Sequence, residues 1–467
     1  MSNPKFFFVK LSELAERMGR FDVPYWLPKF REQRLQLEKC GFELVPLSRF
    51  ICSIESGAGV YDLSESAGWR YLNVNNITPM GIDDANCGFI SSPPDGTATN
   101  TLRCGDVVTG RVGTIGVFCK YASDVPAYIS DNVFRIRLKD CDADYILAIL
   151  NSSIVQCQIE REAKGSLQRV VNKQTIRNLL IPIPPLDVQR RLVAELDAAY
   201  AAKREADEKA TKLLASIDDM VLRELGIAKL PKPDTSLSSR IFTVPAREVL
   251  NDRFDAHYNQ NFFRDLADLI REDKRCCRLG SVGTFVRGVT YKSEDEAECG
   301  HAILRANNVS LEKFELDLSD LVHVNSDLTF SPAQQIKDSD ILICAASGSK
   351  EHAGKVAYVR NAPDDTYIGG FMMVLRTDAG VNPEYVTAYM QSSIFRGLIF
   401  RHLGGTNINN VSLELLNKLP LILPDVAMQD GIALKASSIR AEARKLKADA
   451  TAALDAAKRK IEMRVMK

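Results

Sequence analysis

The amino-acid sequence contains an internal repeat with an offset of 240 residues, and this duplication limits the possible folds more than any other feature. Residues 145–189 and 385–429 align without a gap, and twelve of their 45 positions are identical, against roughly one in 17 expected from average composition. Shorter matches at similar offsets are RFDVPY (20–25) with RFDAHY (253–258) and YLNVNNIT (71–78) with ILRANNVS (303–310). We therefore predict a tandem duplication, with a first copy at roughly 1–233 and a second at 234–467.

Each copy begins with a region of mixed strand and helix patterns. Short runs rich in Val, Ile, Phe and Tyr, punctuated by Gly and Asn, are typical of strands, and they include DVVTGRVG, GVFCKY and NVFRIRL. The segment DADYILAILNSSIVQCQIERE has the spacing of a helix. These patterns predict two α+β domains, at 1–184 and 229–424, each built of one sheet with helices.

Each copy ends in a long helix that starts after a cluster of prolines. The segments LLIPIPPLDVQ (179–189) and LPLILPDVAMQ (419–429) join an apolar run to a proline stop and a Gln. Proline cannot continue the hydrogen-bond ladder of a strand, so the chain leaves the domain in a fixed direction. We assign the spacer regions to 185–228 and 425–467, with helices expected over 187–225 and 426–465.

Both helices carry small and apolar residues at alternating spacings of four and three, in the same register. This spacing with charged flanks is a coiled-coil signal, and a helix of about 38 residues is roughly 60 Å long. The seam residues predicted to pack are Leu192, Leu196, Ala199, Ala206, Leu213, Ile432, Ile439, Ala443 and Leu446. We expect the helices to form a rod between the two domains; the alternative is that each helix only caps a core.

Composition describes an ordinary globular chain that carries no net charge, with 60 Lys and Arg against 60 Asp and Glu. Neutrality weighs against a free-standing DNA-binding protein, although it permits a local basic surface. The N-terminal FFFV is too short for a signal peptide, and no apolar run approaches the roughly 18 residues of a membrane span. The eleven cysteines are scattered without a CxxC, which predicts a reduced, cytoplasmic protein with no membrane contact.

Motifs for catalysis are missing from the sequence. It contains no Walker A loop, no GxSxG and no HExxH, and its five histidines have no metal-ligand spacing. The segment SPPDG (92–96) lacks both the amide and the aromatic residue of an amino-methyltransferase motif. We therefore predict a non-enzymatic binding protein with no catalytic residue, metal or cofactor of its own.

Two similar but diverged domains on a spacer are suited to reading two half-sites of DNA, because half-site spacing follows protein geometry. Arg, Lys, Asn and Gln can contact bases, and Ser and Thr can hold phosphates. Such residues gather in GRVGT, KGSLQR, SGSKEH and RHLGGTNINN, although any one of these loops could be only a solvated turn. The candidate DNA-binding residues are Arg111, Thr114, Lys164, Ser166, Gln168, Arg169, Ser347, Ser349, Lys350, Arg401, Thr406, Asn407 and Asn409.

The order of these motifs resembles the specificity (S) subunit of type I restriction-modification systems. The stretches that carry the resemblance are GDVVTGRVGTIG, KGSLQRVVNKQTIRNLLIPIPPLDVQ and, in the second copy, GGTNINNVSLELLNKLPLILPDVAMQ. The second copy departs from the pattern, because its AASGSKEHAGKVAYV is longer and lacks the R-x-G-x-I-G loop. The likeness covers nearly the whole chain.

The resemblance implies a role for each part. The two α+β domains would be target recognition domains for the halves of a bipartite, asymmetric sequence in double-stranded DNA. The two helices would pack as an antiparallel coiled coil and dock two modification (methyltransferase) subunits, with restriction subunits joining where present. S-adenosylmethionine, ATP and Mg would then belong to the partner subunits. The competing hypothesis is a coiled-coil scaffold with two protein-binding domains and no DNA role.

Overall fold

The structure is a computed structural model that describes residues 7–11, 23–60, 63–64, 68–84, 86–92, 101–163, 169–231, 234, 236–250, 253–310, 315–403 and 409–466. Its contacts divide the chain into two compact units. Unit 1 consists of residues 1–206 and 448–467, and unit 2 consists of residues 207–447. Each of the two longest helices contributes one segment to each unit, and the units are described one at a time.

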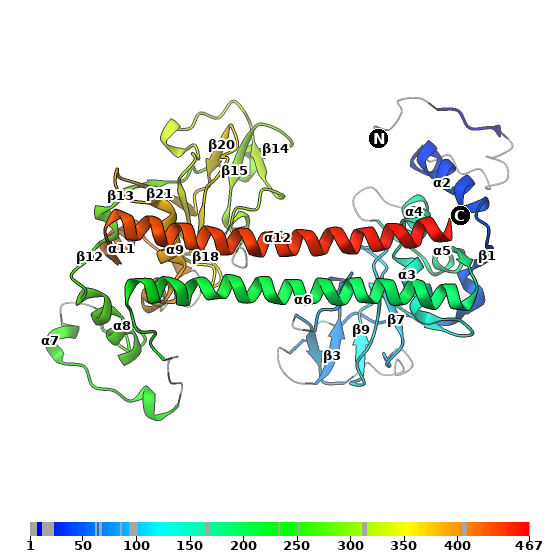
Figure 1. Cartoon of the computed structure of the whole chain (residues 1–467), viewed down its shortest axis with the longest axis horizontal. Coiled ribbons are helices and arrows are strands. Elements are labelled where there is room, and N and C mark those ends of the chain that lie inside the picture. Colours follow the sequence, from blue (N-terminus) through cyan, green and yellow to red (C-terminus); the bar gives the residue numbers. More distant parts are fainter. Residues whose placement is uncertain are drawn as a thin grey trace. The chain divides into compact units, whose positions relative to one another are not determined.

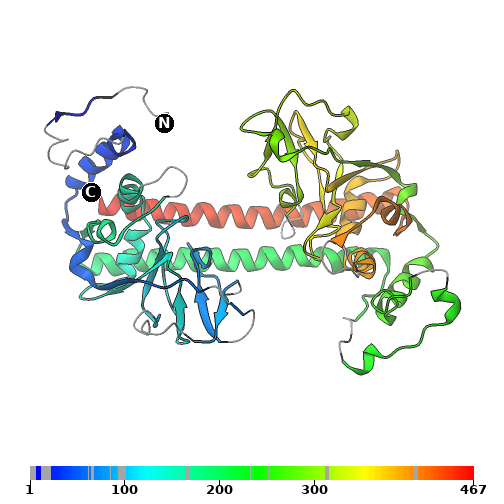
Figure 2. The same cartoon turned by 180° about the vertical axis from the view of Figure 1, so that it is seen from behind.

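Unit 1 is built around a four-stranded antiparallel sheet with the order β2-β10-β7-β8 and a three-stranded sheet with the order β6-β3-β9 (Figures 1 and 2). Two further pairs are β1-β11 and β4-β5. The strands are β1 (Glu43–Pro46), β2 (Ile51–Ser56), β3 (Trp69–Leu72), β4 (Ile77–Thr78), β5 (Gly81–Ile82), β6 (Gly88–Ile90), β7 (Val107–Gly110), β8 (Phe118–Lys120), β9 (Ala127–Ile129), β10 (Val133–Leu138) and β11 (Leu180–Ile183). The helices are α2 (Pro28–Glu38), α3 (Ala143–Leu150), α4 (Ser153–Glu162), α5 (Lys173–Arg177) and the first part of α6 (Leu186–Leu225).

Unit 2 repeats this plan, with sheets ordered β13-β21-β17-β19 and β14-β16-β15-β20 and the pairs β12-β23 and β18-β22. The strands are β12 (Cys276–Arg278), β13 (Gly283–Arg287), β14 (Glu296–Ala297), β15 (His301–Leu304), β16 (Val322–Val324), β17 (Ile341–Cys344), β18 (Ala346–Ser347), β19 (Val356–Tyr358), β20 (Thr366–Ile368), β21 (Met372–Thr377), β22 (Asn409–Asn410) and β23 (Pro420–Ile422). The helices are α7 (Ala246–Val249), α8 (Asn261–Arg271), α9 (Pro383–Gln391), α10 (Ser393–His402), α11 (Leu413–Lys418) and the first part of α12 (Val426–Val465). The matching strand orders confirm the predicted α+β class and the tandem duplication, whereas the prediction of a single sheet in each domain is wrong.

The four-stranded sheet of each unit is buried on both faces. In β7, Val107 belongs to the core formed with the helices, whereas its neighbour Val108 belongs to the core formed with the three-stranded sheet. In β17, Ile343 and Leu342 divide in the same way. Successive side chains of a strand point to opposite faces, so burial on both faces explains why the apolar residues of these strands follow one another without alternation, as VV in β7 and ILI in β17.

The two copies also repeat individual hydrogen bonds at the proline stops. The Tyr145 hydroxyl donates to the carbonyl of Pro182, and the Tyr385 hydroxyl donates to the carbonyl of Ile422. The two glutamines that follow the prolines also form equivalent hydrogen bonds. Gln189 Nε2 donates to Pro184 O and Gln429 Nε2 donates to Pro424 O, each at 2.8 Å. All four side chains are buried, so these bonds fix the angle at which the long helix leaves each sheet.

Helix α6 begins at Leu186 and helix α12 begins at Val426. Each start lies one residue after the predicted start of its spacer region, at 185 and 425 respectively. Glu195 forms ion pairs with Lys460 at 2.7 Å and Arg464 at 3.0 Å in unit 1. Glu224 forms one with Lys435 at 2.7 Å in unit 2. Residue numbers fall along α12 as they rise along α6, so the two helices are antiparallel, as the family resemblance implied.

The predicted seam residues are all buried or half-buried. Four are buried, namely Leu192, Leu196, Ile432 and Ala443, and five are half-buried, namely Ala199, Ala206, Leu213, Ile439 and Leu446. Leu192 and Leu454 share one core with the sheet of unit 1, while Leu222 and Ile432 share one core with the sheet of unit 2. The helices therefore complete the core of each unit in addition to pairing with each other. Within the described residues, no helix combines the length and the apolar character needed to cross a bilayer.

Candidate nucleic-acid interface

Two of the predicted DNA-binding loops lie side by side in unit 1. Val112 forms a β-bridge with Val170, and the amide of Gly113 donates to the carbonyl of Arg169 at 3.3 Å. The amide of Val171 donates to the carbonyl of Arg111 at 3.0 Å. The GRVGT turn after β7 is thus joined by backbone hydrogen bonds to the segment that follows α4. Arg111 and Thr114 of the turn and Arg169 of the segment are all exposed.

The equivalent loops also meet in unit 2. Strand β18 pairs with β22, which sets Ser347 opposite Asn409, and the amide of Val411 donates to the carbonyl of Ala345 at 2.7 Å. Ser349 and Lys350 are exposed in the turn that follows β18, and Ser347 is half-buried. The sequence predicted the four loops separately, and the structure joins the described residues 169–171 to the GRVGT turn and the described residues 409–411 to the SGSKEH loop.

A side chain from a neighbouring helix holds each of these loops in place. In unit 1, Gln156 Nε2 of α4 donates to Gly116 O at 2.5 Å and to Leu150 O at 2.7 Å. In unit 2, Arg396 of α10 donates to Ala353 O at 2.7 Å and to Glu351 O at 2.5 Å. Gln156 and Arg396 stand 240 residues apart and are therefore equivalent positions. Sequence reasoning missed both, although the repeat alignment could have found them.

The longer loop of the second copy has an additional buried support. Lys355 is 3% exposed, and its ammonium donates to Val309 O at 2.7 Å and lies 3.1 Å from His352 Nδ1. Burial lowers the pKa of Lys355, and burial together with the nearby Lys355 charge lowers the pKa of His352. A neutral His352 can accept a hydrogen bond from the ammonium, so the buried Lys355 links His352 of this loop to the backbone at Val309.

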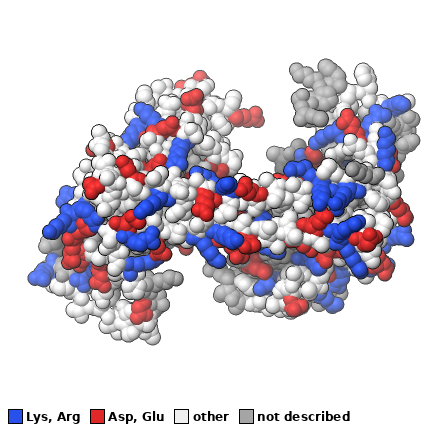
Figure 3. Space-filling model, viewed as in Figure 1, with Lys and Arg blue, Asp and Glu red and all other residues white. Residues whose placement is uncertain are grey.

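The exposed basic side chains of the two loop pairs have few competing protein partners, so they can contact a phosphate or a base. Within the described part of the chain, Arg169 and Lys350 have no ion-pair or hydrogen-bond partner for their side chains. Arg111 is exposed, and its side chain reaches only the carbonyl of Asp131, at 3.5 Å. Basic and acidic side chains are interspersed on the face seen in Figure 3, so any attraction to DNA on that face is local.

Arg401 does not lie where the sequence placed it. We expected it in an exposed loop, but it belongs to the last turn of α10 and is 8% exposed. Its Nε donates to the carbonyl of Tyr258 at 3.0 Å, and its guanidinium lies over the Tyr258 ring. This arginine is committed to internal contacts and is unavailable to a ligand on the surface.

Several candidates lie outside the described residues or are described only in part. Lys164, Ser166, Gln168, Thr406 and Asn407 fall outside the described ranges, and Asn409 is placed by its backbone alone. Their part in DNA contact stays a prediction.

The acidic residue shared by GDVV and SDILI has a structural role in both copies. Asp106 is 4% exposed and pairs with Arg137 at 2.9 Å, while Asp340 is 2% exposed and pairs with Arg376 at 2.8 Å. Each carboxylate also accepts a backbone amide three residues upstream, from Arg103 and Lys337 respectively. Each of these carboxylates is therefore held by an arginine and a backbone amide of its own unit.

Comparison with known proteins identifies the region that contains the unit 1 loop pair. Residues 98–212 match the family model of the type I restriction modification DNA specificity domain. Over 174 residues the chain is 34% identical to the type I restriction enzyme StySPI specificity subunit of Salmonella potsdam and 33% identical to the EcoKI specificity subunit of Escherichia coli K12. Each alignment covers 36% of this chain and only 37% of the relative.

Solved structures of S subunits overlap with most of the chain. The type I S subunit of M. genitalium has 13% identity and a TM-score of 0.40, over 90% of this chain and 96% of that one. The HsdS subunit of Thermoanaerobacter tengcongensis has 16% identity and a TM-score of 0.33, over 91% and 95%. The sequence match of residues 98–212 and the two curated relatives identify this region of the chain as similar to the DNA specificity domain of type I restriction-modification specificity subunits.

Proposed function

We propose that this chain is the DNA-recognition subunit of a type I restriction-modification complex and that it reads a bipartite, asymmetric target. The observation that carries the proposal is the paired loops, repeated at equivalent positions in two units, one of which lies within the matched DNA specificity domain. Two diverged readers on one chain fit a target with two different half-sites. A scaffold without a DNA role is not favoured, because the matched family model is a DNA specificity domain.

The division of labour within the complex follows from the same proposal. Two modification subunits, and restriction subunits where present, would dock on this chain in the cytoplasm and would bring S-adenosylmethionine, ATP and Mg. The chain itself would direct their chemistry without contributing a catalytic group. The buried, fully paired Asp106 and Asp340 support this division, because the acidic residues of the shared motif are occupied by Arg137 and Arg376.

The deciding experiment maps methylated adenines in host DNA with and without the gene for this chain, in the presence of its modification subunit. We expect one bipartite motif to be methylated only when the chain is present. Purified alone with S-adenosylmethionine, the chain should transfer no methyl group to DNA. Methylation by the isolated chain, or an unchanged set of methylated sites after deletion of its gene, would contradict the proposal.

A further inference from the structure

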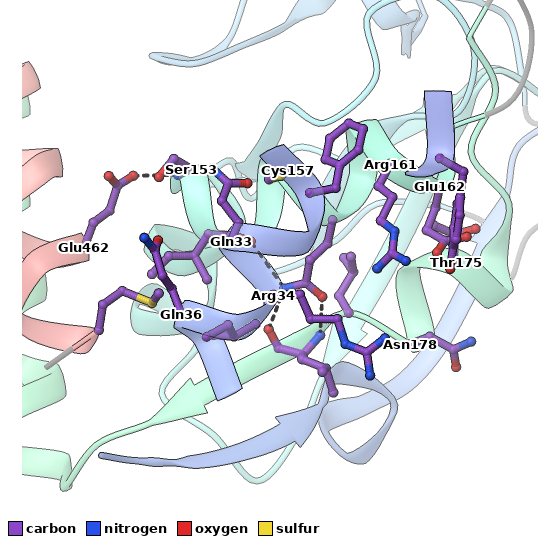
Figure 4. A pocket seen from close by; sticks show the side chains of 18 of the residues that line it. Gln33, Arg34, Gln36, Ser153, Cys157, Arg161, Glu162, Thr175, Asn178 and Glu462 are labelled. Atoms are coloured by element: carbon purple, nitrogen blue, oxygen red, sulfur yellow. Dashed lines mark hydrogen bonds between the residues drawn. The ribbon is translucent and has the colours of Figure 1, made fainter. Parts of the chain in front are cut away.

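A cleft of about 1040 Å³ lies in unit 1 between α2, α4, α5 and the C-terminal end of α12 (Figure 4). Charged side chains that line it already have partners within the unit. Arg34 pairs with Glu38 at 2.7 Å, and the Arg161 guanidinium lies over the ring of Tyr25. The Glu462 carboxylate accepts the first backbone amide of α4 at 2.5 Å. These side chains are therefore used within the unit, in contrast to those of two tight turns beside the candidate DNA-binding loops.

The tight turns stand at equivalent places in the two units. In unit 1 the amide of Val133 donates to the carbonyl of Ser130 at 3.1 Å, and in unit 2 the amide of Met372 donates to the carbonyl of Gly369 at 2.8 Å. Such bonds between the first and fourth residues are typical of β-turns, and these turns connect β9 to β10 and β20 to β21. Their central residues are Asp131 and Asn132 in the first copy and Gly370 and Phe371 in the second.

Each turn is bonded to the end of β7 or β17, where a candidate DNA-binding loop begins. The carbonyl of Asn132 accepts the amide of Arg111 at 2.8 Å. The carbonyl of Phe371 accepts the amides of Ala345 at 2.8 Å and Ala346 at 3.3 Å. These contacts continue the β7–β10 and β17–β21 pairings by one residue. Arg111 and Ala345 are therefore structurally equivalent. The same holds for Asn132 and Phe371.

The equivalent positions carry opposite chemistry in the two units. Unit 1 presents two exposed polar side chains, Arg111 and Asn132. In unit 2, Ala345 is 5% exposed, whereas Phe371 is 72% exposed. In the major groove Arg bonds guanine and Asn bonds adenine, whereas Phe contacts the 5-methyl group of thymine. The second copy, which lacks the arginine of the R-x-G-x-I-G loop, thus presents an exposed aromatic ring beside the vacated position.

The backbone around the second turn holds the Phe371 ring outward. A Cβ added to Gly369 would lie 2.8 Å from the carbonyl oxygen of Leu304. One added to Gly370 would lie 3.0 Å from the carbonyl oxygen of Val289. The turn is therefore packed against neighbouring backbone and cannot shift inward to bury the ring. Exposure of a single ring is ordinary on a protein surface, so the place of this ring beside the paired loops, rather than its exposure, indicates a function.

We propose that Phe371 contacts the 5-methyl group of a thymine in the half-site read by unit 2. This contact takes the place of the hydrogen bonds that Arg111 and Asn132 offer in unit 1, so the two units read different bases from equivalent positions. The inference rests on the proposed function, since it names one base contact within the recognition that the proposed function assigns to unit 2.

The first test removes the methyl group of thymine and leaves base pairing unchanged. The full chain in complex with its modification subunit is titrated with duplexes that carry the motif mapped by methylation sequencing, and each thymine is replaced in turn by deoxyuridine. At one thymine of one half-site, we expect binding by the wild type to weaken about fourfold, which corresponds to one buried methyl group. In Phe371→Ala the same replacement should have no effect, because the ring that contacts the methyl group is gone.

The matched control is Leu318→Ala. Leu318 is an apolar side chain of unit 2 that is 41% exposed and lies outside both the turn and the paired loops. This variant should bind the thymine and deoxyuridine duplexes as the wild type does. The inference is overturned if no deoxyuridine weakens binding by the wild type, or if wild type and Phe371→Ala lose the same factor. A unit 2 half-site without thymine on either strand would also overturn it.

The second test gives the turn of unit 2 the residue found in unit 1. Phe371→Asn should replace the preference for thymine by one for adenine at the same base pair and leave the other half-site unchanged. Sequencing of methylated sites measures the motif, and a melting curve shows that the variant is folded. An unchanged motif, or a change in both half-sites, would contradict the inference. If the wild-type complex reads no bipartite motif, the proposed function falls as well, so the two failures are distinguishable.

Discussion

Arg401 lies over the ring of Tyr258, with its guanidinium carbon 4.1 Å from the ring centre. In the first copy Arg161 lies over Tyr25 in the same way, at 4.0 Å. The two arginines are 240 residues apart and the two tyrosines are 233 apart, so two separate matches in the sequence repeat meet as one repeated contact. In each unit this stack fastens the segment before the first strand to the helix that supports the paired loops.

This stack should contribute measurably to stability. Replacing Tyr258 by Leu removes the ring under a buried guanidinium, and a desolvated cation–π contact contributes about 2 kcal/mol. We expect the free energy of unfolding, measured by urea denaturation, to fall by about that amount. Tyr258→Phe keeps the ring and should stay close to wild type. Equal losses in the two variants would show that the ring is not the important group.

Breaking the buried ion pair of the second copy should lower the free energy of unfolding by more than loss of the Tyr258 ring does. Asp340→Asn removes the charge opposite Arg376 while keeping the side-chain shape, and breaking a buried pair costs about 3 kcal/mol. The Arg376 side chain is 24% exposed, so the loss should lie at or below that figure. Asp364→Asn, an exposed position in the same unit, is the control. Thermal unfolding of the two variants measures the difference, and similar melting temperatures would contradict the structural role of Asp340.

Stability should depend on pH through His301. Its Nδ1 lies 2.6 Å from Asp365 Oδ1 and its Nε2 lies 3.1 Å from Leu328 O, so the doubly protonated ring can donate to both. The hydrogen bond to Asp365 raises the pKa of His301 above its ordinary value of 6.5. The stabilisation is therefore complete below pH 6.5 and is lost as the pH rises through the folded-state pKa.

The variant Asp365→Asn tests this pH dependence and tolerates the left-handed backbone at that position, where φ is 52°. We expect the difference in unfolding free energy between wild type and variant to be largest between about pH 5 and 6 and to shrink at higher pH. A difference that is constant from pH 5 to 9 would exclude the His301 charge as its source.

The helix seam can be tested with two alanines of α12. Ala443 is 2% exposed, whereas Ala453, which follows the same sequence periodicity, is exposed. Ala443→Leu should lower the free energy of unfolding by about 1–3 kcal/mol through overpacking. Ala453→Leu should change it by less than about 0.5 kcal/mol. Chemical denaturation measures the free energy of unfolding of both variants. Equal losses would mean that the buried face of α12 has been assigned wrongly.

Local patterns predicted the long helices and their limits well, because proline stops and seam spacing act over a few residues. The pairing of the candidate DNA-binding loops could not be predicted in the same way, since Val112 and Val170 are brought together by the fold between them. Arg401 was misplaced for a related reason. Its loop-like neighbours suggested exposure, but α10 extends through His402, and Tyr258, 143 residues earlier, covers the arginine.

The recognition loops lead to the most specific prediction, which concerns the two half-sites. Arg111 and Arg169 belong to the loop pair of unit 1, and Lys350 belongs to that of unit 2. Under the proposed function, Arg111→Ala or Arg169→Ala should relax the sequence of one half-site, and Lys350→Ala should relax only the other. A lost base contact should cost about 1–3 kcal/mol at one base pair, whereas a lost phosphate contact should weaken all sequences and reduce the salt slope by about one unit.

Arg401→Met is the control that separates a change in half-site sequence from a loss of folding. Arg401 is buried against Tyr258, so its replacement should affect folding alone. It should lower stability without a change in the bases that are read. The readout is sequencing of methylated sites with the modification subunit present, combined with a melting curve of each variant. If Arg111→Ala and Lys350→Ala alter the same half-site, or if Arg401→Met changes the motif while the protein remains folded, the assignment of one reader to each unit is wrong.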